Sequence, residues 1–165
     1  MITRLPARTV LTVTASGTPD EVFKEIMPSL YGTAYGTKFK VYKPKGKKME
    51  IGRLTSAYPK GLRVPMSKWT IVTDLEVSSF VTAKALIQKN PARPAKLVKR
   101  PAGTYAQILH VGPYDKERPA VDLLQKFIKE KKLKVIGPHE EVYLTMPGPK
   151  AKTIIQYRVK AQRGK

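Results

Sequence analysis

TVLTVTASG (residues 9–17) and YAQILHVG (residues 105–112) are two stretches of similar design, and a helical pattern follows each of them. In both, apolar residues run up to a glycine, as expected of a strand that is at least half buried. After the first stretch, Thr18, Pro19 and Glu21 form the signals of a helix start, namely an N-cap, a proline in the first turn and a capping box. We therefore expect the chain to contain two copies of one structural unit.

Each copy continues into further strand patterns, so the repeated order is strand, helix, strand, strand. We predict one domain over residues 1–165, in which module one covers about 5–80 and module two about 96–160. A linker at about 81–95 joins them, and a basic tail (161–165) follows. The predicted fold class is α+β: two pseudo-symmetric modules form a curved antiparallel sheet, with the helices on one face and a ligand cleft on the other.

Within module one, the apolar stripe of the helix is expected to end near Gly32, and the alternation in residues 39–42 predicts a strand. Within module two, residues 140–145 read as a strand whose successive side chains point to opposite faces. We expect Val142 and its neighbours on one face to pack against the helices. Glu141 and the other residues of its face would then line the cleft.

The net charge of the chain indicates which classes of partner it attracts. Of its 165 residues, 32 are Lys or Arg and 12 are Asp or Glu, which gives a net charge of +20 that is spread over both halves. Such a charge attracts polyanions, so non-specific binding of nucleic acid is one expectation. The alternative is a solvated basic surface that only reflects the general composition of the host's proteins.

Several classes of protein are excluded by composition. The chain has no Cys, which rules out disulfides, thiol catalysis and Cys-ligated metals. It has no apolar run near the ~18–20 residues of a transmembrane helix, and residues 1–6 lack the apolar core of a signal peptide. We expect a cytoplasmic protein without a membrane partner, and no pattern indicates an oligomeric state.

The candidate binding residue is Glu141, an acid on an apolar strand of a basic protein. A carboxylate among aromatic side chains is a natural counter-charge for a lipophilic cation. The alternative is a salt bridge to one of the many Lys or Arg residues. Aromatic residues that could form the walls of a cleft, because they offer flat apolar area and a polar group, are Tyr143, Trp69, Tyr58, Tyr35 and Tyr31.

Other site chemistry receives less support from the sequence. His110 and His139 are the only histidines, and a lone His on a strand is usually a structural hydrogen-bonding group, so we predict no metal site and no cofactor. Residues 38–48 interleave aromatics with lysines, which is the best local case for nucleic-acid binding. A lysine-rich hairpin edge is the alternative, because such edges protect strands from aggregation.

Four segments, residues 30–38, 105–115, 136–145 and 153–159, resemble the GyrI-like (gyrase-inhibitor-like) small-molecule-binding domains. The resemblance implies two strand-helix-strand-strand modules with a cleft between them. In the effector-binding domains of multidrug-sensing transcription activators, a cleft glutamate meets cationic lipophilic ligands, and Glu141 matches it. Some stand-alone relatives hydrolyse strained, cyclopropane-bearing genotoxins in the same cleft.

The chain departs from the hydrolase-like pattern at two places. LTSAY (residues 54–58) stands where that group has Leu-Glu-Gly-Leu-Trp, and TMP (residues 145–147) stands where Asp-Pro is usual. These departures favour binding over catalysis. Since we expect no DNA-reading helix-turn-helix ahead of residue 9, the resemblance is to a stand-alone member rather than to a complete activator.

The predicted function is therefore the binding of planar, lipophilic compounds, including cations, for the sensing or sequestration of drugs or toxins. The first alternative is a hydrolase of strained electrophiles that uses Glu141 as general acid or base. The second is a nucleic-acid-associated or topoisomerase-associated protein that acts through basic residues such as Lys45, Lys47 and Lys48.

Overall fold

The first copy of the repeat folds as its sequence predicts. β2 (Arg8–Ser16) ends at Gly17, and Thr18 caps α1 (Pro19–Thr37). The Glu21 N–H donates to the Thr18 hydroxyl at 3.4 Å, and the Thr18 N–H donates to the Glu21 carboxylate at 3.3 Å. The predicted capping box is confirmed, and it sets the point at which the chain leaves the sheet to form the helix.

The structure is a computed structural model that describes residues 1–163. Of the predicted basic tail, Gly164 and Lys165 lie outside the described residues, whereas Ala161 is the last residue of a strand. Within residues 1–163, neither of the long helices has the length and apolar character that crossing a bilayer requires. The remaining helix and strands are β1 (Ile2–Leu5), β3 (Ile51–Tyr58), β4 (Thr70–Val77), β5 (Lys96–Arg100), β6 (Gly103–Val111), α2 (Arg118–Glu130), β7 (Leu133–Val135), β8 (His139–Tyr143) and β9 (Lys152–Ala161).

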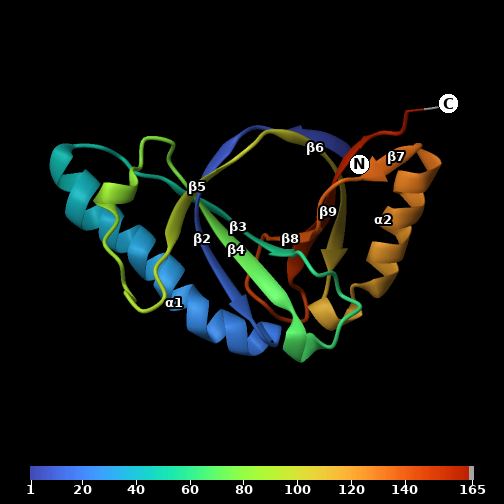
Figure 1. The fold of residues 1–165 in the computed structure, drawn as a ribbon, viewed down its shortest axis with the longest axis horizontal. Helices are drawn as coiled ribbons and strands as arrows, with labels where there is room; N and C mark the ends of the chain where they lie inside the picture. Colours follow the sequence, from blue (N-terminus) through green and yellow to red (C-terminus); the bar gives the residue numbers. More distant parts are fainter. Residues whose placement is uncertain (164–165) are drawn as a thin grey trace.

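The strands form a curled antiparallel sheet in the order β1-β6-β9-β8-β3-β4-β2-β5, and β7 pairs with the end of β9 (Figure 1). This order is symmetric about the junction of β8 with β3. The strand that precedes each module pairs with the other module. β1, which precedes the first module, pairs with β6 of the second, and β5, which precedes the second module, pairs with β2 of the first. The α+β class with a curved antiparallel sheet is confirmed.

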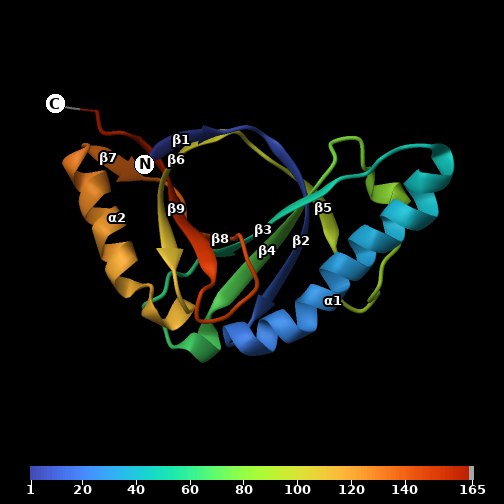
Figure 2. The same ribbon diagram turned by 180° about the vertical axis from the view of Figure 1, so that it is seen from behind.

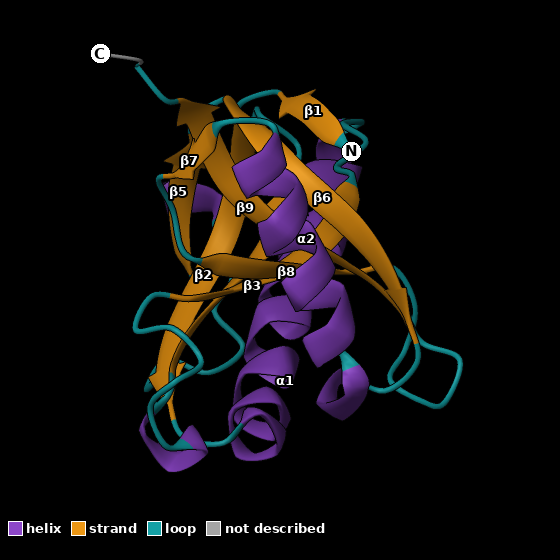
Figure 3. Ribbon diagram, turned by 90° about the vertical axis from the view of Figure 1, so that its right-hand side faces the viewer, coloured by secondary structure: helices purple, strands orange, loops and turns teal. Residues whose placement is uncertain are grey.

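Both helices cover the same face of the sheet, one at each end, as Figures 1 and 2 show from opposite sides. From α1, residues such as Ile26 and Leu30 pack in a core with Leu11 and Leu75 of the sheet. From α2, residues such as Leu124 pack in a separate core with β6 and β9. Figure 3 shows α2 lying across these strands. Because the helices occupy the two ends, the middle of this face, on β3 and β8, is left between them.

The predicted position of the cleft was wrong. Glu141 and Tyr143 share a face, as predicted, but this is the face that carries the helices, since Tyr143 pairs with Leu54 and Leu54 with Leu75 of the α1 core. The opposite face holds Glu140, Val142 and a polar network. The alternation along a strand predicts which side chains share a face, but it does not predict which face the helices cover. Because the two helices lie apart, the strip of sheet between them stays open on the helix face.

Two local predictions in module one were also wrong. Residues 39–42 are not a strand, because α1 continues into a π-helix (Lys38–Tyr42). Nor does α1 end near Gly32, which lies within the helix; a Cβ there would come within 2.6 Å of the Lys89 side chain. Gly32 therefore permits the close approach of the linker rather than marking the end of the helix.

We predict that Leu30→Ala lowers the free energy of unfolding by about 2–5 kcal/mol, because Leu30 is fully buried and its loss leaves a cavity. The matched control is Leu123→Ala, since Leu123 lies on a helix too but is 60% exposed. We expect this control to change stability by no more than about 0.5 kcal/mol. Urea denaturation measures both, and equal losses would contradict the packing of α1 against the sheet.

Candidate functional site

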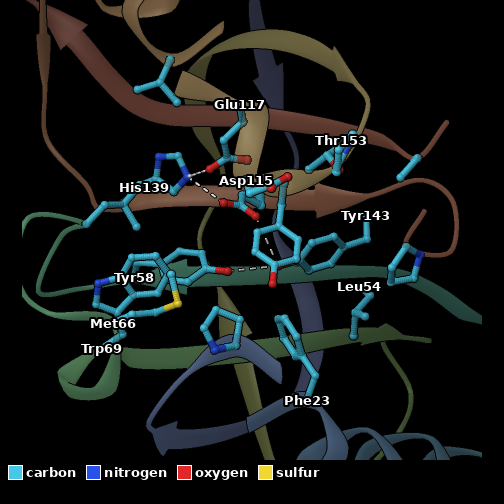
Figure 4. A pocket seen from close by; sticks show the side chains of 18 of the residues that line it. Phe23, Leu54, Tyr58, Met66, Trp69, Asp115, Glu117, His139, Tyr143 and Thr153 are labelled. Atoms are coloured by element: carbon cyan, nitrogen blue, oxygen red, sulfur yellow. Dashed lines mark hydrogen bonds and ion pairs between the residues drawn. The ribbon is translucent and has the colours of Figure 1, made fainter. Parts of the chain in front are cut away.

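A pocket of about 1420 Å³ lies on the strip between α1 and α2. Side chains of β3 and β8 form its base, and the first turns of both helices form its sides. Figure 4 shows Glu117 and His139 meeting on one side of the pocket and Phe23 on the other, with Tyr58 and Tyr143 between them. The pocket therefore joins an acidic side to an aromatic side.

Strand geometry places three polar side chains at the base of this pocket. His139, Glu141 and Tyr143 alternate along β8, so all three point to the same face. Across the junction of the modules, His139 pairs with Tyr58 and Glu141 with Ser56. The site thus lies where the two halves of the sheet meet.

His139 is held between two carboxylates and a phenol. Its Nε2 lies 2.9 Å from Glu141 Oε2 and 3.6 Å from Glu117 Oε1, and its Nδ1 lies 2.8 Å from the Tyr157 hydroxyl. The side chains of His139 and Glu141 are almost fully buried, at 3% and 5% exposed. We name Glu117, His139 and Glu141 the acid–histidine cluster.

The acid–histidine cluster carries a net negative charge. Burial opposes a charge on His139, but its contacts with Glu117 and Glu141 outweigh burial and raise its pKa to about 11. Burial raises the pKa of Glu117 to about 7, although the neighbouring His139 lowers it. Above neutral pH, two carboxylates therefore share one imidazolium, and the cluster has one negative charge in excess.

Glu117 is the member of the cluster that is open to a ligand. It is the residue before α2, its side chain is 12% exposed, and it lines the pocket. Its Oε2 is buried and has no hydrogen-bond partner among residues 1–163. By contrast, Glu141 Oε2 contacts His139, and Glu141 Oε1 accepts from the Tyr143 hydroxyl at 3.4 Å. A buried acceptor without a partner is costly unless a ligand or water fills its place.

Two tyrosines extend the hydrogen bonds of the cluster. The hydroxyls of Tyr58 and Tyr143 lie 3.2 Å apart. Burial, with the nearby charge of Glu141, raises the pKa of Tyr143 far above its ordinary value, and burial raises the pKa of Tyr58 as well. Both phenols therefore remain neutral, and because Tyr143 donates its one proton to Glu141, Tyr58 donates to the Tyr143 hydroxyl oxygen.

The structure brings most of the predicted residues together. Of the predicted wall residues, Tyr35 is the exception: it does not line the pocket, is 45% exposed, and stacks against Tyr31 and Phe39. The pocket is lined by the other five predicted residues, Glu141, Tyr143, Trp69, Tyr58 and Tyr31. Trp69 is held in place by a 2.9 Å hydrogen bond from its indole N–H to the Val64 carbonyl.

Sequence reasoning missed Glu117 and His139 as site residues. His139 and Glu141 stand two residues apart on a strand, and this spacing was a usable signal that they share a face. Glu117 gave no such signal, because it reaches His139 only through the packing of α2 against the sheet.

The acid–histidine cluster also has a spacing that a metal ion could bridge, since its ligand atoms all lie within 4.8 Å of one another. A metal requires an unprotonated imidazole nitrogen. In His139, Nδ1 contacts Tyr157 and Nε2 contacts Glu141, so a metal ion on either nitrogen would have to displace an existing hydrogen bond. The geometry thus fits an ion-pair cluster better than a metal centre.

The family of GyrI-like small molecule binding domains matches residues 1–160, almost the whole chain. The chain belongs to this family. A search among curated proteins found no match.

Solved structures share the GyrI-like fold at low sequence identity. A hydrolase from Listeria innocua is similar at a TM-score of 0.77 and 22% identity, over 96% of this chain and 91% of the other. The C-terminal domain of EcmrR is similar at a TM-score of 0.72 and 18% sequence identity, over 98% of this chain and 97% of the other. SAV2435, solved with tetraphenylphosphonium bound, is similar at a TM-score of 0.50 and 13% sequence identity, over 97% of this chain and 93% of the other. At these identities the similarity establishes the fold.

We predict that the stability of this GyrI-like domain depends on pH through Glu117. The folded state retains a proton on Glu117 between pH 4.5 and about 7, where the unfolded chain releases it, so stability falls as the pH rises through this window. In Glu117→Gln this loss of stability is absent. The difference in the free energy of unfolding between wild type and Glu117→Gln should therefore change by about 1–3 kcal/mol from pH 4.5 to 7.

Urea unfolding of both proteins across this range provides the test. Glu140, whose pKa burial also raises, is present in both proteins and cancels in the comparison. A difference that does not change with pH, or that changes in the opposite direction, would contradict the raised pKa of Glu117.

Proposed function

We propose that this GyrI-like domain binds planar, lipophilic cations in the pocket between its helices, for the sensing or sequestration of such compounds. The observation that carries the proposal is the acid–histidine cluster, with its excess negative charge and the unpartnered Oε2 of Glu117. A cation placed beside Glu117, the most exposed member of the cluster, would compensate the excess negative charge. The proposal differs from the sequence prediction in assigning the counter-charge to the cluster rather than to Glu141 alone.

The distribution of charge in the chain supports a positively charged ligand. Five of the 12 acidic residues line the pocket, against four of the 32 basic residues and the imidazolium of His139, so the lining is neutral in a chain that is otherwise strongly basic. Acids are thus concentrated at this site in a protein of net charge +20. The basic surface slows the approach of a cation, but its effect is screened over about 8 Å at physiological salt, so the nearby carboxylates dominate within the pocket.

The aromatic side of the pocket supports a flat ligand. Tyr58 and Trp69 meet edge to face with centroids 5.5 Å apart, and Phe23 and Tyr143 meet in the same way at 5.8 Å. Such rings offer flat apolar area, and their faces attract cations. The volume of about 1420 Å³ exceeds that of an ordinary small-molecule site and accommodates several fused rings. The tetraphenylphosphonium bound to SAV2435, which has a similar fold, is a lipophilic cation as well.

The test compares N-methylphenanthridinium, a planar cation, with phenanthridine, its neutral parent, at pH 8. In Glu117→Gln, we expect at least ten-fold weaker binding of the cation, about 1.4 kcal/mol, and binding of the neutral compound within about two-fold of wild type. Calorimetry gives the affinities, and quenching of Trp69 fluorescence reports binding at the pocket, because Trp69 lines it and is the only Trp.

The matched control is Glu130→Gln, which removes the same charge from an exposed position at the end of α2. This control should leave both affinities unchanged. A cation affinity that survives Glu117→Gln, or an equal loss for the charged and the neutral compound, would contradict the proposal.

A second candidate function is hydrolysis of a strained electrophile in the same pocket. The observation that favours it is the pKa of about 7 for Glu117, which suits a general base near neutral pH. Glu117 would take a proton from water while the water oxygen bonds to the electrophilic carbon. The strained bond breaks, and the proton passes to the atom that leaves. The similarity in fold to a hydrolase from Listeria innocua is consistent with this alternative.

Mass spectrometry of an activated cyclopropane compound, recovered after incubation with the protein, tests this candidate. Hydrolysis predicts a product heavier by one water. In Glu117→Gln the product should fall by at least ten-fold, while calorimetry still detects binding of the uncharged compound. Recovery of the unchanged compound from wild-type protein would remove the enzyme from consideration and leave the binding proposal intact.

A further inference from the structure

A second surface of the molecule combines lysines with exposed aromatic rings. Between Glu25 and Glu50, the chain has six lysines and no acidic residue. This segment covers most of α1, the π-helix and the turn that follows. The end of α1 that leads into it points away from α2 and from the junction of the modules (Figure 1). This segment therefore concentrates positive charge at the end of the molecule that lies away from α2.

The linker adds to this surface. Its backbone is attached to the helical segment by three hydrogen bonds, in which the N–H groups of Lys89, Ile87 and Thr82 donate to the hydroxyls of Thr33, Thr37 and Tyr42 at 3.0–3.1 Å. The linker has no acidic residue of its own. We name the residues of the two segments, 35–48 and 82–89, the basic end.

Most lysines of the basic end lack an acidic partner. Among residues 1–163, the ion pair found in these segments is that of Lys48 with Glu50, at 3.6 Å and with both side chains largely exposed. Other lysines instead contact aromatic rings: Lys43 and Lys38 approach the Phe39 ring to 5.4 Å and 5.6 Å from its centroid. Such contacts leave the charge of the ammonium groups uncompensated.

The aromatic rings at the basic end form an exposed stack. Phe39 lies nearly parallel to Tyr35, with a 13° angle between the rings and centroids 6.2 Å apart, and Tyr35 continues the stack to Tyr31. Phe39 is 50% exposed and Tyr35 is 45% exposed. Neither lines the pocket. Large rings that remain this exposed beside a cluster of lysines indicate a surface that meets a partner.

We propose that the basic end binds single-stranded nucleic acid, with a base stacking on Phe39, the ring that ends the stack, and phosphates meeting the surrounding lysines. The uncompensated charge attracts a polyanion, and the exposed rings favour a polyanion that also offers flat faces. A duplex hides the faces of its bases, so it would use the lysines but not the rings. This activity is separate from small-molecule binding, because the residues that carry it lie outside the pocket.

Fluorescence anisotropy with labelled oligothymidylate and with a duplex of equal length tests the proposal. Wild-type protein should bind the single strand at least ten-fold more tightly than the duplex at the same salt concentration. Phe39→Ala keeps every charge and should weaken binding of the single strand at least ten-fold, with little effect on the duplex. Circular dichroism establishes that the variant is folded.

Two triple variants separate the basic end from the total charge. Lys43→Gln, Lys45→Gln and Lys47→Gln should together weaken binding and reduce its dependence on salt. The control replaces Lys126, Lys129 and Lys132 with Gln, which removes the same charge from α2 and the turn after it. This control should have at most a two-fold effect.

Equal losses in the two triple variants, equal affinity for single strand and duplex, or no effect of Phe39→Ala would each overturn the proposal. Glu117→Gln should leave the affinity for oligothymidylate unchanged. Failure of the cation to bind in the pocket therefore has no bearing on this test, and the two proposals stand or fall separately.

Discussion

The pairing of β3 with β8 is the constraint on which the rest of this structure depends. It joins two modules that each have their own helix and their own core, and it makes the sheet symmetric about one junction. Because each helix covers the strands of its own module, the junction itself remains uncovered. The pocket is a consequence of this arrangement, and the side chains available to line its base are those that β3 and β8 direct to the helix face.

The same constraint explains how a buried acidic site can exist in a basic protein. β8 places His139 and Glu141 on the helix face, and the start of α2 brings Glu117 to the same ring nitrogen, Nε2, that Glu141 contacts. One imidazolium between two carboxylates makes burial of these charges tolerable, since a buried charge needs a partner. The remaining negative charge is then available to a ligand. Tyr157 holds the second ring nitrogen and so orients the imidazole toward both acids.

Much of this architecture could be predicted from the sequence, because it follows from local rules. The repeat, the capping box at Thr18 and the alternation along β8 all depend on residues close together in the chain. The face of the cleft was mispredicted, since alternation does not tell which face the helices cover. Residues 39–42 alternate like a strand but continue a helix, and their environment is set by the linker that packs beside them. Glu117 reaches the site only because α2 packs against the sheet, and no residue spacing in the sequence indicates that it lies beside His139.

The central claim is that His139 is an imidazolium held by two carboxylates. Nitrogen NMR of the two histidine rings tests it directly, and His139→Gln identifies which signals belong to His139, since His110 is the only other histidine. We expect both ring nitrogens of His139 to stay protonated from pH 6 to pH 9, in accord with a pKa of about 11. A neutral imidazole at pH 7, with one unprotonated nitrogen, would contradict it, because the cluster would then hold a different charge from the one on which the proposed function rests.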